Sequence, residues 1–393
     1  MYDVHSVRED FPVLKDVIYL DNAATTQTPV PAVREMEEYF FRYAGNHGRG
    51  AHRLARETTN HYEDAREIVA SFLGTDAKKT VFTRNATESI NIVSRGFPWE
   101  AGDHVIVTLV EHHSNLLPWL RLKDEGVNFS IVRPDITGVV NPEDIMSAIN
   151  ERTRLIAVNH ISNVFGSTQD VQTIVRLAHK EDVMVLVDGS QSAGHMPLDI
   201  GSIDPDFFAT PGHKGLLGPQ GTGVLYMKDP DMIEPVFVGG GMVRSVTDTG
   251  YETEPSPAKF EAGTPNMPGI IGLGRAVEYV KDIGVGDIER HETSLARDAA
   301  SQLAQIDGVE VYGPEDRTSV VSFNVKGMNA HDVAMILDQT KNICVRSGYH
   351  CAIPGTDLLG VDGTVRASFA LYNTQEEVDV FIETVSSIVS LVA

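Results

Sequence analysis

The segment HKGLLGPQGTG (213–223) carries a lysine, Lys214, followed by glycines at 215, 218, 221 and 223. Lys214 comes directly after a short apolar run, at the end of a predicted strand. Glycines allow sharp turns and leave space beside the lysine for a flat ligand. The segment lacks the glycine-lysine-serine/threonine sequence of a phosphate loop. Taken alone, it fits either a ligand-binding lysine or a glycine-rich turn with a solvated lysine.

An aspartate closes an earlier apolar run, in VDGSQSAGH (187–195). A carboxylate at Asp188 could hold a protonated ring nitrogen, which makes an aromatic ring an acceptor of electrons. An aspartate at a strand end is also a common N-cap of the next helix. A lysine at the end of a later strand favours the ring-binding interpretation.

Two further segments could contact such a ligand. In TRNATESINIVSRG (83–96), a turn leads into an amphipathic helix, so the N–H groups of Ala86, Thr87 and Glu88 could bind an anion. An ordinary helix cap gives the same pattern. In EHHSN (111–115), His112 follows a strand and could stack on a flat ring, although a structural histidine fits equally well.

The chain has two cysteines, Cys344 and Cys351. This number excludes a disulfide framework and argues against a zinc site, so we expect no metal. Cys344 lies in the apolar run NICV and is expected to be buried. Cys351 lies in the loop RSGYHCAIPG, where Arg346 and His350 would favour a thiolate. Cys351 is therefore a candidate nucleophile.

These residues must be positioned by the elements around them. Short apolar runs alternate with amphipathic stretches such as 171–182, which predicts a mostly parallel sheet covered on both faces and an α/β fold. Ligands bind at the carboxyl ends of strands in such sheets, where the polar residues above fall. The predicted strands are 104–110, 128–134, 154–162, 183–190, 206–212 and 222–228.

The pattern changes near residue 266. We predict a large ligand-binding domain over 15–265 and a smaller α+β C-terminal domain over 266–393, with residues 1–14 packing against the smaller one. A helix is expected from Gly269 to Ile283. A second helix, capped by Asn373 and Thr374, carries an apolar stripe to Val392. The segment 239–260 is rich in Gly, Thr, Ser and Pro and predicts an exposed hairpin or lid.

Charge and hydropathy limit the possible partners. The formal net charge is −23, with 55 acidic against 32 basic residues, which disfavours binding to nucleic acid. No apolar run is long enough to span a membrane, and the N-terminal sequence has no pattern of a signal peptide. We therefore expect a cytoplasmic protein with neither nucleic acid nor membrane as a partner.

Nine segments in order give the chain a family resemblance. It resembles the class V group of fold-type I pyridoxal 5′-phosphate (PLP) enzymes, most of all the SufS-like cysteine desulfurases and selenocysteine lyases. The resemblance implies a PLP-transferase fold and a homodimer with its active site at the interface. The segments are YLDNAATT (19–26), TRNATESIN (83–91), EHHSNLLPW (111–119), NHISNVFGS (159–167), VDGSQSAGH, GHKGLLGPQGTG, FEAGTPN (260–266), VRSGYHCA (345–352) and VRASFALYNT (365–374).

The resemblance assigns roles toward the cofactor. Lys214 would carry PLP covalently, Asp188 would pair with the pyridine nitrogen, and His112 would stack over the ring. Gln191 and Asn163 would contact the ring hydroxyl. The phosphate would be held by Ala86, Thr87 and His213 and, across the interface, by Thr264 of a second subunit.

The resemblance also implies a reaction. Arg366 would bind the carboxylate of L-cysteine, beside Asn163 and Ala24. Lys214 and His112 would transfer protons, and Cys351 would accept sulfur as a persulfide while L-alanine leaves. A partner protein could then receive the sulfur for iron–sulfur cluster assembly or related biosynthesis. The alternatives are another class V activity (an aminotransferase, a selenocysteine lyase or a β-eliminating lyase) or a non-catalytic scaffold.

Four positions depart from the family pattern. Ala86 and Pro211 stand where relatives often carry hydroxyl groups for the phosphate, and Thr210 is a possible substitute for them. Gly48 and Tyr349 stand where relatives usually carry histidine.

Overall fold

The computed structural model describes residues 2–48 and 50–391. Their largest sheet has seven strands in the order β2-β8-β7-β6-β5-β3-β4. β8 is antiparallel to both of its neighbours, and the pairs from β7 to β4 are parallel, so the mostly parallel sheet is confirmed. The strands are β2 (Thr80–Thr83), β3 (His104–Thr108), β4 (Asn128–Val132), β5 (Thr153–Asn159), β6 (Met184–Asp188), β7 (Phe207–Pro211) and β8 (Gly223–Met227).

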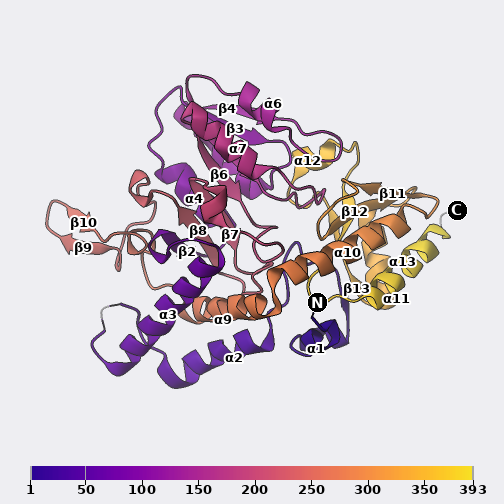
Figure 1. The fold of residues 1–393 in the computed structure, drawn as a ribbon, viewed down its shortest axis with the longest axis horizontal. Coiled ribbons are helices and arrows are strands. Elements are labelled where there is room, and N and C mark those ends of the chain that lie inside the picture. The colour runs from indigo at the N-terminus through magenta and orange to yellow at the C-terminus, as the bar shows by residue number, and fades with distance from the viewer. Residues whose placement is uncertain (1, 49, 392–393) are drawn as a thin grey trace.

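Helices cover both faces of this sheet (Figure 1). Successive strand residues point to opposite faces, so Val105 and Ile106 belong to different core clusters. Ile106 packs in the cluster that includes α3 (Arg53–Phe72) and α7 (Val171–Ala178). Val105 packs in the cluster that includes α4 (Ala86–Gly96) and α5 (Leu117–Arg121). Burial on both faces explains why these strands are almost continuously apolar.

The predicted helix at 269–283 is α9 (Met267–Ile283). It packs along α2 (Val30–Glu38) and α3, and its apolar residues join the core beneath the large sheet. α10 (Val285–Leu303) follows directly. Further short helices are α1 (Val4–Arg8), α6 (Pro142–Ser147), α8 (Ile200–Ile203) and α12 (Ile353–Asp357).

A second, antiparallel sheet is built from β11 (Val309–Tyr312), β12 (Val320–Val325), β15 (Thr364–Ser368) and β14 (Arg346–Gly348), in that order. α10, α11 (Ala330–Lys341) and α13 (Gln375–Val389) share a core with it. Thr374 caps α13 in a capping box with Glu377, as predicted. Val392, the predicted end of the apolar stripe, lies outside the described residues.

The N-terminal segment packs against the C-terminal part of the chain. β1 (Ile18–Tyr19) pairs in parallel with β13 (Ile343–Cys344). Val7 and Phe11 pack in one cluster with residues of α9 and with Tyr372. The predicted division at residues 265 and 266 stays a prediction. Cys344 is half-buried, so its predicted full burial was wrong: the two-residue strand leaves its side chain partly open to solvent.

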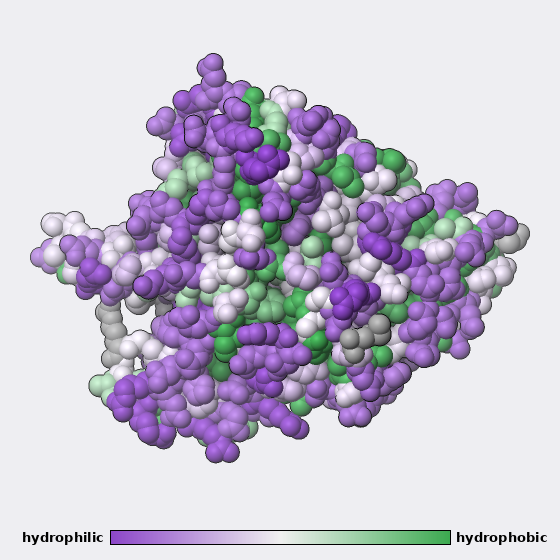
Figure 2. All heavy atoms as spheres, viewed as in Figure 1, coloured by the Kyte–Doolittle hydropathy of each residue, from purple (hydrophilic) through white to green (hydrophobic). Residues whose placement is uncertain are grey.

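The segment 239–260 contains an exposed hairpin, as predicted, formed by β9 (Val243–Val246) and β10 (Tyr251–Thr253). It projects away from both sheets (Figure 1). Hydrophilic residues cover most of the face shown in Figure 2. Among the described residues, no helix is long and apolar enough to cross a membrane.

Candidate active site

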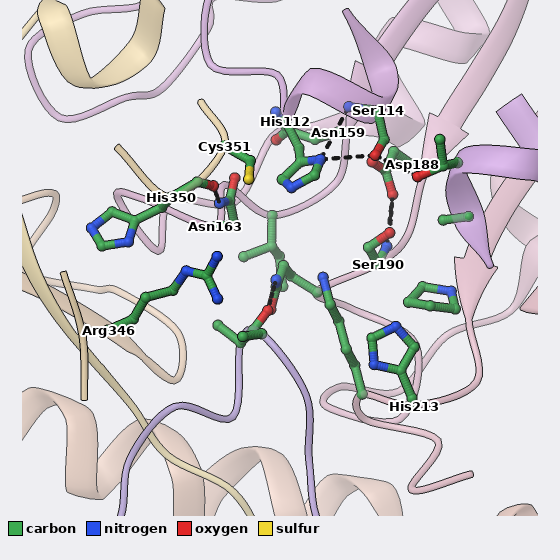
Figure 3. A pocket seen from close by; sticks show the side chains of 18 of the residues that line it. His112, Ser114, Asn159, Asn163, Asp188, Ser190, His213, Arg346, His350 and Cys351 are labelled. Carbon is green, nitrogen blue, oxygen red and sulfur yellow. Dashed lines mark hydrogen bonds between the residues drawn. The ribbon is translucent and has the colours of Figure 1, made fainter. Parts of the chain in front are cut away.

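A pocket lies where the strands of the large sheet end, and β14 and β15 close its other side (Figure 3). It brings together all the predicted site residues except Thr264. These residues are Ala24, Ala86, Thr87, His112, Asn163, Asp188, Gln191, His213, Lys214, Cys351 and Arg366.

Thr264 is exposed and lies outside this pocket. It lines a different hollow together with Gly48, Gly241 and Glu261. Its role toward the phosphate of a second subunit stays a prediction.

Asp188 is the last residue of β6 and is buried. Its carboxylate accepts hydrogen bonds from the hydroxyl and, at 2.9 Å, from the backbone N–H of Ser190. Burial raises the pKa of Asp188, while Ser190 and the Lys214 cation oppose the rise. A buried carboxylate of this kind gains from a cationic partner, such as a protonated ring nitrogen. Nearby, Gln191 is held by a 2.8 Å hydrogen bond to the carbonyl of Ala23.

Lys214 follows β7, and the Thr26 hydroxyl donates to its carbonyl oxygen at 2.7 Å. Burial lowers the pKa of Lys214 to about 8, against the opposing influence of Asp188. Its amine therefore loses its proton more easily than an exposed lysine does, and the uncharged amine is the nucleophilic form.

His112 caps a short 3₁₀ helix (His113–Asn115), and the backbone N–H of Ser114 donates to its Nδ1 at 3.1 Å. Because Nδ1 is the acceptor, the neutral ring carries its hydrogen on Nε2. Burial, together with the charge of Lys214, lowers the pKa of His112 to about 3. His112 is thus a neutral imidazole at the centre of the pocket (Figure 3).

The N-terminus of α4 forms the anion-binding end of the pocket. The Asn85 side chain caps the helix by accepting from the Glu88 N–H at 2.9 Å. The N–H groups of Ala86 and Thr87 have no carbonyl partner within the helix, so they can donate to an anion. His213 lies opposite, with Nδ1 3.2 Å from the Thr25 hydroxyl. Burial lowers the pKa of His213 to about 4, so it contributes a neutral ring.

Arg366, on β15, is buried. It donates to the Asn163 carbonyl at 3.0 Å and to Asp21 Oδ1 at 3.2 Å. Its Nε has no hydrogen-bond partner among the described residues. Burial lowers the pKa of Arg366 to about 10, which leaves the guanidinium charged at neutral pH. It can therefore bind a carboxylate.

Sequence reasoning missed Asp21 and the place of Arg346 in the pocket. Arg346 stands opposite Arg366 in the β14–β15 ladder, and its Nη1 lies 4.0 Å from Asp21 Oδ2. The carboxylate of Asp21 thus lies near two guanidinium groups. YLDNAATT was a usable signal for Asp21, but only the strand register shows that the two arginines face each other.

Cys351 is exposed and faces the pocket beside His112 and Asn163 (Figure 3). Its carbonyl accepts from the His113 N–H at 2.7 Å, and the His350 carbonyl accepts from Asn163 Nδ2 at 2.8 Å. His350 and Cys351 have φ angles of +53° and +56°, in the left-handed region. These hydrogen bonds hold the strained pair in place.

One prediction about Cys351 was wrong. His350 was expected to favour a thiolate by its charge, but its ring is buried and its Nε2 contacts the Thr364 hydroxyl at 2.8 Å. Burial, assisted by the neighbouring arginines, lowers the pKa of His350 to about 2. His350 is therefore neutral, and the guanidinium groups that line the pocket together with Cys351 are those of Arg346 and Arg366.

A second missed residue, Glu111, lies beneath the pocket and is buried. It accepts hydrogen bonds from Thr108 (2.6 Å), Asn115 (2.7 Å) and the backbone N–H of Asn159 (2.9 Å). Burial raises the pKa of Glu111 to about 8. Glu111 joins the ends of β3 and β5 and so supports both His112 and Asn159. No cluster of three metal-ligating side chains occurs among the described residues.

Comparison with known proteins identifies the family of this chain. Residues 18–381 match the family model described as aminotransferase class-V. The chain belongs to this family. A probable cysteine desulfurase of Methanothermobacter thermautotrophicus is 48% identical over 391 residues, which cover 98% of each chain.

Two solved structures resemble this class-V chain closely. The apo structure of cysteine desulfurase from Thermococcus onnurineus NA1 has a TM-score of 0.96 at 42% identity and 99% coverage of both chains. The cysteine desulfurase CsdA from Escherichia coli, in an S-sulfonic acid form, has a TM-score of 0.93 at 36% identity, covering 100% of this chain and 99% of the other. The predicted α/β fold of the fold-type I PLP enzymes is thereby confirmed.

Proposed function

We propose that this chain is a PLP-dependent cysteine desulfurase that converts L-cysteine into L-alanine and takes the sulfur onto Cys351. One observation carries the proposal: an exposed cysteine faces the same pocket as Lys214, Asp188 and the buried Arg366. The relatives named above, which carry the name cysteine desulfurase, support the same activity.

The donor set fits PLP. Asp188 suits a pyridinium nitrogen, Gln191 and Asn163 suit a ring hydroxyl, and the start of α4 suits a phosphate. Three buried polar atoms of lining residues, Asn159 Oδ1, His350 Nδ1 and Arg366 Nε, have no hydrogen-bond partner within the described residues. Buried polar groups are normally hydrogen-bonded, so the pocket suits a polar ligand.

Bound PLP would supply an electron sink for the Cα of the attached amino acid. The residues of the chain bind the substrate and transfer its protons. Arg366 binds the substrate carboxylate and orients the amino acid. Lys214 Nζ, which has a lowered pKa, takes the proton from Cα. Neutral His112 presents its Nε2 hydrogen to the pocket and serves in proton transfer.

Sulfur transfer balances without an outside oxidant. The Cys351 thiolate attacks the substrate sulfur, so a sulfur–sulfur bond forms and the carbon–sulfur bond breaks. The electron pair of the broken bond stays on Cβ and is protonated there. L-Cysteine and the Cys351 thiol thus become L-alanine and a Cys351 persulfide.

The Cys351 persulfide must lose its outer sulfur before the next turnover. We therefore propose that an acceptor protein takes this sulfur toward iron–sulfur cluster assembly or related biosynthesis. We also propose a cytoplasmic homodimer in which Thr264 of each subunit reaches the phosphate site of the other. The exposed position of Thr264 outside its own pocket supports this arrangement.

The test is incubation with L-cysteine and a thiol reductant, with alanine and sulfide measured together. We expect both products from the wild type and from the control Cys344→Ala. Cys351→Ala should release neither sulfide nor persulfide but should keep the visible absorbance of bound PLP. Sulfide release that survives in Cys351→Ala would contradict the proposal. A wild type that binds PLP but yields neither product would indicate another class V reaction, and one that binds no PLP a non-catalytic scaffold.

A further inference from the structure

Ser114 lies where the anion-binding end of the pocket meets His112. Its Oγ is 2.7 Å from the Thr87 hydroxyl and 3.0 Å from His112 Nδ1. The side chain is half-buried and lines the pocket. Figure 3 shows Ser114 between the helix side of the pocket and the histidine ring. One hydroxyl group therefore contacts both the start of α4 and the central imidazole.

The anion-binding end is poor in charge and in hydroxyl groups. Ala86 and Pro211 line it but carry no hydroxyl. Thr210 does not replace them, because its hydroxyl is buried and lies 3.4 Å from each of two carbonyl oxygens, those of Gly189 and Pro211. His213 is neutral, as its lowered pKa requires. An anion bound here depends on neutral hydrogen-bond donors. Each hydroxyl group at this end of the pocket therefore contributes to its affinity.

The hydrogen of the Ser114 hydroxyl is available for this purpose. A hydroxyl has one hydrogen and two lone pairs. The single lone pair of His112 Nδ1 already accepts from the backbone N–H of Ser114 at 3.1 Å, so the ring does not depend on the hydroxyl. The Ser114 and Thr87 hydroxyls share one hydrogen bond, which uses only one of their two hydrogens. The second hydrogen can turn toward an anion beside them, and both can do so once the anion replaces their mutual bond.

We propose that Ser114 binds the phosphate of the cofactor, together with Thr87 and the N–H groups at the start of α4. Its hydroxyl takes the place of those that positions 86 and 211 do not supply. The inference rests on the proposed function, because the phosphate is that of PLP.

The experiment is titration of the apoprotein with PLP and with pyridoxal, which lacks the phosphate, followed by visible absorbance. The variants are Ser114→Ala, Ser114→Thr and the control Ser147→Ala, an exposed serine on α6. Loss of one hydrogen bond to a charged group should weaken PLP binding by roughly tenfold in Ser114→Ala. Pyridoxal binding should stay unchanged. Ser114→Thr, which keeps a hydroxyl, and Ser147→Ala should bind PLP as the wild type does.

A rescue variant adds an independent measure. Ala86→Thr in the Ser114→Ala background returns a hydroxyl to the same end of the pocket, so PLP affinity should recover most of its loss. Equal PLP affinity in wild type and Ser114→Ala would overturn the inference. So would an equal loss of PLP and pyridoxal binding, since that pattern marks a structural role. A wild type that binds neither compound would instead overturn the proposed function itself.

Discussion

At the residue scale, burial sets the ionisation of the basic groups around the pocket. The pKa of Lys214 is lowered to about 8, that of His112 to about 3 and that of His213 to about 4, each chiefly by removal from water. Desolvation penalises the charged form, so the histidines are neutral and the lysine loses its proton readily. The pocket thus offers neutral bases to a ligand while Arg366 keeps the fixed positive charge.

The first prediction concerns the uptake of PLP by the apoprotein. Only the uncharged amine of Lys214 reacts with an aldehyde, and its pKa is about 8. The rate of uptake should therefore rise roughly tenfold between about pH 7 and pH 9 and then level off. Stopped-flow absorbance would measure it.

Asp188→Asn is the comparison for this pH profile. Asp188 raises the pKa of Lys214, so its removal should move the inflection to lower pH. A wild-type inflection near the ordinary pKa of a lysine side chain would contradict the lowered pKa of Lys214.

At the element scale, a buried ion pair joins α3, β2 and the segment that follows the hairpin. Arg66 Nη1 lies 2.6 Å from Glu261 Oε1, and Arg66 Nη2 donates to Glu261 Oε2 at 2.9 Å. Arg66 also donates to the Thr80 carbonyl, and Glu261 accepts from the Phe82 N–H at 2.7 Å. The pair therefore fixes the start of FEAGTPN, the segment that carries Thr264.

Arg66→Ala leaves Glu261 buried without its cation, and we expect a loss of about 3–5 kcal/mol in the free energy of unfolding. Guanidinium denaturation would measure it. The matched control is Arg53→Ala on the same helix, whose pair with Glu57 is exposed and worth about 0–1 kcal/mol.

A double variant tests whether the unpaired buried charge causes this loss of stability. Arg66→Met with Glu261→Met removes both charges, so it should lose less stability than Arg66→Ala does. Similar losses for Arg66→Ala and Arg53→Ala would show that burial of the pair has no energetic consequence.

The sequence predicted individual helices and strands better than it predicted which of them pack together. Asp188 and Lys214 could be placed at strand ends because apolar runs mark where buried strands stop. The helix at α9 was evident from its periodicity, but its packing against α2 and α3 was not. The contact between Asp21 and Arg366 joins residues 345 positions apart. Periodicity carries no information about such contacts, because it reports only on neighbours along one element.

At the scale of the whole molecule, the net charge of −23 opposes the compact state through self-repulsion. Salt screens this repulsion. We expect the thermal midpoint to rise as sodium chloride increases from low ionic strength to about 0.5 M, where the Debye length falls to a few ångströms. Differential scanning calorimetry would measure it. Potassium chloride at equal ionic strength should act alike, and a midpoint that falls with salt would contradict the expectation.

The β1–β13 pair determines when the pocket can form during synthesis. β1 has no strand partner until β13 has been made, and Asn22 donates to the carbonyl of Ser368 at 2.6 Å. Residues 18–24 therefore leave the ribosome early but can reach their final place only after residues 343–368 have been made. Such long-range closure slows folding and exposes intermediates to aggregation. A nascent chain that stops before residue 343 has the large sheet but not the wall of the pocket that bears Cys351 and Arg366.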